Sequence, residues 1–111
     1  APMNRTLSLS DGDRERLQTH LIDQLPATRL GQLPEGTIWG DCLQWAEVLP
    51  LNRVDLLILD PPYNLNKDFN GQKFSRQSVD DYAHWLEQAI IRLKPLLKET
   101  ASVYICGDWF S

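Results

Sequence analysis

The hydrophobic pattern predicts alternating strands and helices from about residue 37 onward. Residues 54–59 are almost continuously apolar, which is typical of a strand buried on both faces of a parallel sheet. Residues 37–39 and 102–106 are β-branched and aromatic runs that favour strands. Residues 42–49 and 79–93 carry apolar side chains at helical spacing. This order predicts an α/β fold with an open, mostly parallel sheet and helices on its faces.

Two other segments have weaker patterns. The acceptor side chains from Ser10 to Asp13 favour a helix start, and apolar residues then recur at helical spacing as far as Leu25. We therefore expect residues 1–36 to hold an N-terminal helix, ended by Pro26, and a connector. Residues 64–77 are polar and without periodicity, which predicts a mobile loop long enough to act as a lid.

Charge and composition narrow the class of protein. The formal net charge is −4, whereas a free-standing nucleic-acid binder usually presents a basic surface. The acidic net charge disfavours a complete DNA-binding protein, but it is compatible with a catalytic unit whose DNA contacts lie elsewhere. No apolar run approaches the roughly 18 residues of a membrane span, and no signal-peptide pattern is seen. Cys42 and Cys106 lack metal-type spacing, so we expect buried, reduced thiols, no metal site and a cytoplasmic location.

Acidic residues follow the predicted strands. Asp41, Asp60 and Asp108 each come at or just after a strand end. Ligands of open parallel sheets bind at the carboxyl ends of the strands. These acids are therefore candidates for a binding site, with the alternative that polar residues simply tend to follow strands.

The segment Asp60-Pro61-Pro62-Tyr63 suits one particular chemistry. The amino nitrogen of adenine or cytosine is a poor nucleophile, so its hydrogens must be drawn toward fixed acceptors. The Asp60 carboxylate and the Pro61 carbonyl can accept them, and the proline pair stiffens the backbone. Tyr63 offers a ring for stacking, worth about 1–3 kcal/mol, which offsets much of the few kcal/mol needed to extrude a base from a duplex. We expect Asp60, Pro61, Pro62 and Tyr63 to be catalytic.

Residues 57–64 resemble the catalytic motif of amino-group DNA methyltransferases, and residues 39–42 resemble the segment that commonly precedes it. The resemblance spans about residues 37–108 and implies a Rossmann-like class I methyltransferase fold. It also implies S-adenosylmethionine as the cofactor, with Asp41, Cys42 and Asp60 near it, and DNA as the partner. A bacterial, archaeal or phage-encoded restriction–modification system is the expected setting.

One departure from the family is clear. Members carry a Phe-x-Gly-x-Gly loop that cradles the cofactor, and this chain has none. In a permuted subclass that loop lies downstream of the Asp-Pro-Pro-Tyr motif, an order that this chain fits. We therefore expect residues 37–111 to be the target-base half of the catalytic domain. The missing remainder or a second chain would complete it, and the full-length protein could form a homodimer.

Several alternatives stay open at this stage. N6 of adenine is the expected target, but N4 of cytosine, N6 of adenine in RNA, or a non-catalytic subunit would fit a similar motif. Relatives that methylate protein glutamine tend to begin the motif with Asn, so Asp60 argues against them. Asn64, Lys67, Lys73 and Arg76 are candidate DNA contacts, with turn chemistry and solvated loop charge as the respective alternatives. The tryptophans Trp39, Trp45 and Trp85 are expected in the core.

Overall fold

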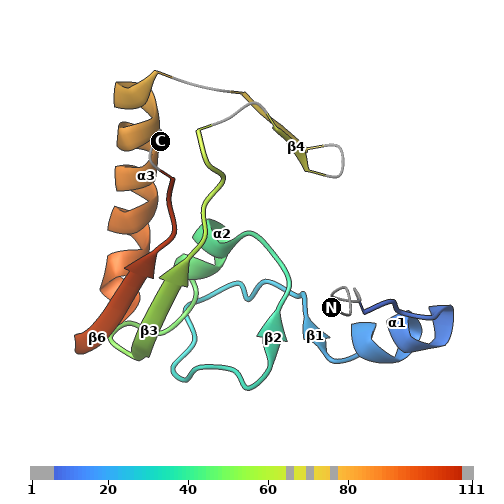
Figure 1. Ribbon diagram of the computed structural model, residues 1–111. Coiled ribbons are helices and arrows are strands. Elements are labelled where there is room, and N and C mark those ends of the chain that lie inside the picture. The colour runs from blue at the N-terminus through green and yellow to red at the C-terminus, as the bar shows by residue number, and fades with distance from the viewer. Residues whose placement is uncertain (1–6, 65–66, 70–71, 76–77, 109–111) are drawn as a thin grey trace, which may run out of the picture.

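The computed structural model describes residues 7–64, 67–69, 72–75 and 78–108 (Figure 1). The chain forms three two-stranded sheets, in the orders β1-β2, β3-β6 and β4-β5. Its elements in order are α1 (Asp11–Gln18), β1 (Leu21–Ile22), β2 (Thr37–Ile38), α2 (Cys42–Ala46), β3 (Val54–Leu59), β4 (Lys67–Phe69), β5 (Gln72–Phe74), α3 (Val79–Leu93), the 3-10 helix η1 (Lys94–Leu96) and β6 (Leu97–Ile105).

The β3–β6 pair is the centre of the fold. The two strands are parallel, with Ile58 opposite Tyr104 and Leu59 opposite Ile105. Helix α3 lies between them in sequence and runs beside them in space (Figure 1). The amide of Cys106 donates to the Leu59 carbonyl at 2.8 Å, so pairing continues past the end of β6. The segments after β3 and after β6 therefore leave the sheet at the same edge.

The core lies on one face of this sheet. Ala46, Leu93 and Leu96 are buried there, and partly buried apolar residues of α2 and β3 pack against them. On β3 and β6, Leu56, Ile58 and Tyr104 stay 50%, 65% and 63% exposed. The prediction that residues 54–59 are buried on both faces is thus wrong for the described part of the chain, where helices cover only one.

Helix α3 begins where the sequence predicts. The Ser78 side chain accepts a hydrogen bond from the Asp81 amide at 3.1 Å and caps the helix. Ser10 and Asp13 likewise cap the start of α1 through reciprocal hydrogen bonds.

The predicted end of the first helix is wrong. Helix α1 stops at Gln18, and residues 21–22 form β1, which pairs in parallel with β2. The helix has no buried residues, so little holds its periodic continuation in place. Pairing with β2 half-buries Leu21 and Ile22, and this tertiary contact overrides the local helical spacing.

The sheet arrangement also differs from the prediction. Strand β2 exists but pairs with β1 and not with β3 or β6, so the expected three-stranded sheet is two separate parallel pairs. Strand β6 begins at Leu97, before the predicted Ser102, and α2 ends at Ala46. The predicted loop 64–77 contains an antiparallel pair, β4 with β5. Strands and helices still alternate around parallel pairing, which is consistent with a Rossmann-like fold without completing one.

Within the described residues, no helix combines the length and the apolar character needed to cross a membrane.

Candidate active site at the carboxyl ends of β3 and β6

The Asp-Pro-Pro-Tyr segment begins directly after β3. The Asp60 side chain is exposed, Pro61 is buried, and Pro62 and Tyr63 are half-buried. The prolines thus tie the turn to the protein while the carboxylate stays accessible to a ligand. This is the arrangement that the proposed acceptor role of Asp60 requires, since a carboxylate sealed in the core could not meet a base.

Four ionisable groups meet at this edge of the sheet. The negative charge of Asp60 is the main cause that raises the pKa of Tyr63 above its ordinary value, with further contributions from burial and from Cys106 and Asp108. Tyr63 therefore keeps its proton at neutral pH. The Cys106 amide, which donates to the Leu59 carbonyl at 2.8 Å, places the residues that follow β6 beside those that follow β3, as parallel pairing requires.

Helix α3 holds this turn through Tyr82. Its hydroxyl donates to the Pro62 carbonyl at 2.8 Å, and its ring stacks on Trp85 with centroids 5.8 Å apart. Tyr82 is 4% exposed, and burial is the main cause that raises its pKa. Sequence reasoning placed Tyr82 in the apolar stripe of a helix and missed this contact. The signal available was that a buried tyrosine hydroxyl needs a hydrogen-bond partner.

The candidate DNA contacts are only partly described. Asn64 is 2% exposed, and this burial favours the turn alternative over a direct contact with DNA. Lys67 lies on β4 and Lys73 on β5, but their side chains, like all of Arg76, lie outside the described residues. Their contact with DNA stays a prediction.

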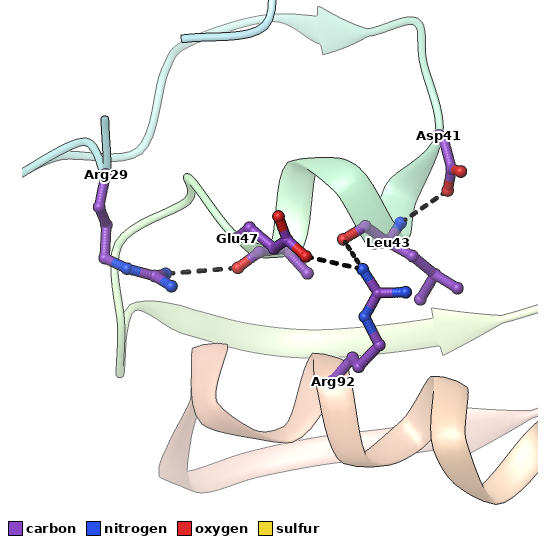
Figure 2. Close-up of polar contacts among 6 residues, drawn as sticks. Arg29, Asp41, Leu43, Glu47 and Arg92 are labelled. Atoms are coloured by element: carbon purple, nitrogen blue, oxygen red, sulfur yellow. Dashed lines mark hydrogen bonds and ion pairs between the residues drawn. The ribbon is translucent and has the colours of Figure 1, made fainter. Parts of the chain in front are cut away.

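A polar network fixes helix α2 (Figure 2). One Asp41 carboxylate oxygen accepts from the Leu43 amide at 2.9 Å and caps the helix. From α3, Arg92 donates to the Leu43 carbonyl and pairs with Glu47, both at 3.0 Å. Arg29 of the connector donates to carbonyl oxygens near the other end of α2. The two arginines were missed by sequence reasoning, because no local pattern marks partners so distant in the chain.

An apolar cavity of about 230 Å³ lies beside the start of α2. Gly40, Cys42 and Trp45 line it together with residues of β2, β3, α3, η1 and β6. Trp45 is buried at 4% exposure as expected, whereas Trp39 is 64% exposed, contrary to the prediction. Trp85 is half-buried. The Cys42 thiol is exposed and Cys106 half-buried, so the expectation of two buried thiols is also wrong.

The residues predicted to meet the cofactor are thus accessible. Asp41 and Cys42 are both exposed, and Cys42 borders an apolar cavity that could take a flat ring. A carboxylate acceptor next to an apolar surface fits an adenosine group, whose hydroxyl and amino groups donate hydrogen bonds. No group of three or more potential metal ligands occurs within the described residues.

Fold and site together define an α/β protein that presents an acidic, tyrosine-bearing edge to its ligand. Residues 54–110, from β3 to beyond β6, match the model of the DNA methylase family of N6 and N4 methyltransferases. The chain belongs to this family.

Curated relatives agree with this assignment. The chain is 36% identical over 81 residues to the DNA adenine methyltransferase YhdJ of Escherichia coli, covering 73% of this chain and 27% of that protein. It is 29% identical over 94 residues to the type II methyltransferase M.BglII of Bacillus subtilis, covering 85% and 24% respectively. The chain thus spans about a quarter of the length of these relatives. No solved structure matches it significantly.

Proposed function

We propose that the protein transfers a methyl group from S-adenosylmethionine to the N6 amino group of adenine in a base extruded from DNA. The observation that carries this proposal is the exposed Asp60 carboxylate beside Tyr63, on a turn that belongs to the family's motif. A relative named as a DNA adenine methyltransferase supports adenine over cytosine as the target.

Each residue of the motif has a role in this proposal. Asp60 accepts a hydrogen bond from one amino N–H and the Pro61 carbonyl accepts one from the other, which orients the nitrogen lone pair for attack. As the nitrogen–carbon bond forms, the carbon–sulfur bond of the sulfonium breaks, and the amino nitrogen gives up one proton, which leaves along the Asp60 hydrogen bond to water. Tyr63, kept neutral, stacks on the base and offsets part of the cost of extrusion. Asp41 and Cys42 would hold the adenosine part of S-adenosylmethionine, which supplies an electrophilic methyl group when bound.

We further propose that additional segments of a longer protein complete the domain, residues 37–111 being its target-base half. The exposed apolar residues Leu56, Ile58 and Tyr104 support this, because parallel sheets are normally covered on both faces. The coverage of only about a quarter of each relative points the same way. Lys67, Lys73 and Arg76 would contact DNA phosphates near the extruded base.

Asp60→Ala in the complete enzyme tests the proposed chemistry. Labelled S-adenosylmethionine and unmethylated genomic DNA are the substrates, and mass spectrometry of the nucleosides identifies the product. We expect methyl transfer to fall by about 10²-fold or more, since one electrostatic contact to the reacting group is lost, while DNA affinity persists.

Asp55→Ala is the matched control. Asp55 is also an exposed aspartate of the β3 segment, but it pairs with Lys98 at 2.7 Å, away from the carboxyl edge. Near-wild-type transfer is expected from this variant. Transfer by Asp60→Ala at a similar rate would refute the catalytic role of Asp60. If the product is instead methylated at N4 of cytosine, cytosine and not adenine is the target base.

A further inference from the structure

We propose that Tyr82 is a positioning residue, whose hydroxyl fixes the peptide group between Pro62 and Tyr63 and so holds the Tyr63 ring ready for the extruded base. This inference rests on the proposed function. It assigns to helix α3 a part in base binding, although Tyr82 itself does not contact the base.

The backbone of the turn has few soft torsions. The ring of Pro62 locks its own φ, and the peptide group that follows is planar. The remaining freedom that orients the Pro62–Tyr63 peptide plane is the ψ angle of Pro62. A hydrogen bond to the Pro62 carbonyl oxygen restrains this angle directly, and with it the direction in which the chain enters Tyr63.

The Tyr82 side chain, which donates this hydrogen bond, is held rigidly in place. Tyr82 is 4% exposed, its ring stacks on Trp85, and its amide donates to the Ser78 carbonyl at 3.0 Å in the first turn of α3. The Ser78 side chain in turn caps that turn through the Asp81 amide. The Tyr82 hydroxyl is therefore a fixed donor that ties the site to a 15-residue helix.

The hydrogen bond from Tyr82 also gives the two proline carbonyls different roles. Tyr82 binds the carbonyl of Pro62 at 2.8 Å, and not that of Pro61, to which the proposed mechanism assigns an amino hydrogen. The hydroxyl thus stabilises the turn without competing for the acceptor that the base needs. After burial and Asp108, Tyr63 is also among the causes that raise the pKa of Tyr82.

Tyr82→Phe in the complete enzyme removes the hydroxyl and keeps the ring that stacks on Trp85. Single-turnover methylation of unmethylated genomic DNA with saturating S-adenosylmethionine is the assay. We expect the rate constant to fall by about threefold to tenfold, as the loss of one hydrogen bond would give, with unchanged affinity for the cofactor. Thr19→Val, which removes an exposed side-chain hydroxyl that donates to the Arg16 carbonyl at the end of α1, is the control and should keep the wild-type rate.

A double-mutant cycle with Tyr63→Ala separates positioning from mere structural support. If Tyr82 acts through the Tyr63 ring, Tyr82→Phe should change the rate by less than about twofold once that ring is gone. An equal loss in both backgrounds, or a wild-type rate for Tyr82→Phe alone, would overturn the positioning role while leaving the proposed function intact. If the wild-type enzyme methylates neither adenine nor cytosine, the proposed function fails and this inference fails with it.

Discussion

Gly40, immediately before the cap of α2, is predicted not to tolerate a side chain. A Cβ added there would lie 2.7 Å from Nε1 and 3.1 Å from Cδ1 of Trp45, closer than ordinary van der Waals contact. Trp45 is 4% exposed and sits on α2 with its ring in the core. Because the indole cannot swing into solvent without losing this packing, either the ring or the backbone must shift in Gly40→Ala.

Two opposing effects decide the size of the change. Overpacking a well-packed site costs about 1–3 kcal/mol. Replacing glycine by alanine also restricts the unfolded chain, which stabilises the fold by about 0.4–1 kcal/mol. Steric repulsion is the larger effect, so we expect the free energy of unfolding to fall by about 1–2 kcal/mol in Gly40→Ala.

Urea unfolding followed by tryptophan fluorescence measures this difference. Gly31→Ala is the matched control, because a Cβ at Gly31 meets nothing within 4 Å. We expect that control to be as stable as the wild type or slightly more so. Adding Trp45→Phe to Gly40→Ala should cost less than the sum of the single changes, because the smaller ring relieves the clash. Equal stability of the two alanine variants would refute the steric explanation.

Two further predictions concern α3. Arg92→Met should lower the free energy of unfolding by about 0.5–1 kcal/mol. Glu47→Gln should lower it less, because the exposed ion pair contributes little and the hydrogen bond from Arg92 to the Leu43 carbonyl survives. Equal losses for the two variants in urea unfolding would contradict the view that the hydrogen bond contributes more than the ion pair. Burial raises the pKa of Tyr82, so its contribution to stability should be complete below about pH 10, the tyrosine value in an unfolded chain, and be lost as pH rises through the raised pKa. Tyr82→Phe should therefore lose less stability than the wild type over that alkaline range, and parallel pH profiles would exclude the effect.

The parts of the fold that local chemistry determines were predictable. The apolar run 54–59 gave β3 with its observed bounds, and Ser78 gave the start of α3. The position of the candidate catalytic turn, directly after β3, was also predictable, because its proline pair and its acid follow an apolar run. These features depend on neighbours in the sequence, which a pattern records directly.

Other features depend on partners far away in the chain. The pairing of Leu21 with Thr37 has no local signal that outweighs the helical spacing before it. The bond from Tyr82 to Pro62 spans 20 residues, and the one from Arg92 to Leu43 spans 49. Such contacts follow from the packing of α3 against the sheet and α2, which no sequence window contains.

The β4–β5 pair had a signal that the prediction did not use. Asn70-Gly71 stands in the sequence between the two strands, and this dipeptide strongly favours short hairpin connections. The polar composition of residues 64–77 outweighed it in the prediction of a loop. A short two-stranded sheet needs little apolar character, so composition was the poorer guide here.

The one prediction about β3 that failed, burial on both faces, bears on the completeness of the site. Burying a large apolar side chain stabilises a protein by about 1.5–3 kcal/mol. Covering Leu56, Ile58 and Tyr104 would therefore contribute several kcal/mol. That is a large fraction of the free energy of unfolding of a typical domain, which is about 5–15 kcal/mol. Strand alternation continued past Leu59 places Asp60 on the same side as Ile58. Segments that cover the exposed face of β3 would therefore also border the Asp60 carboxylate, restrict its access to water and strengthen its interaction with an amino group. The apolar character of β3 thus supports the proposal that further segments complete the domain, and strand alternation places those segments beside the proposed acceptor Asp60.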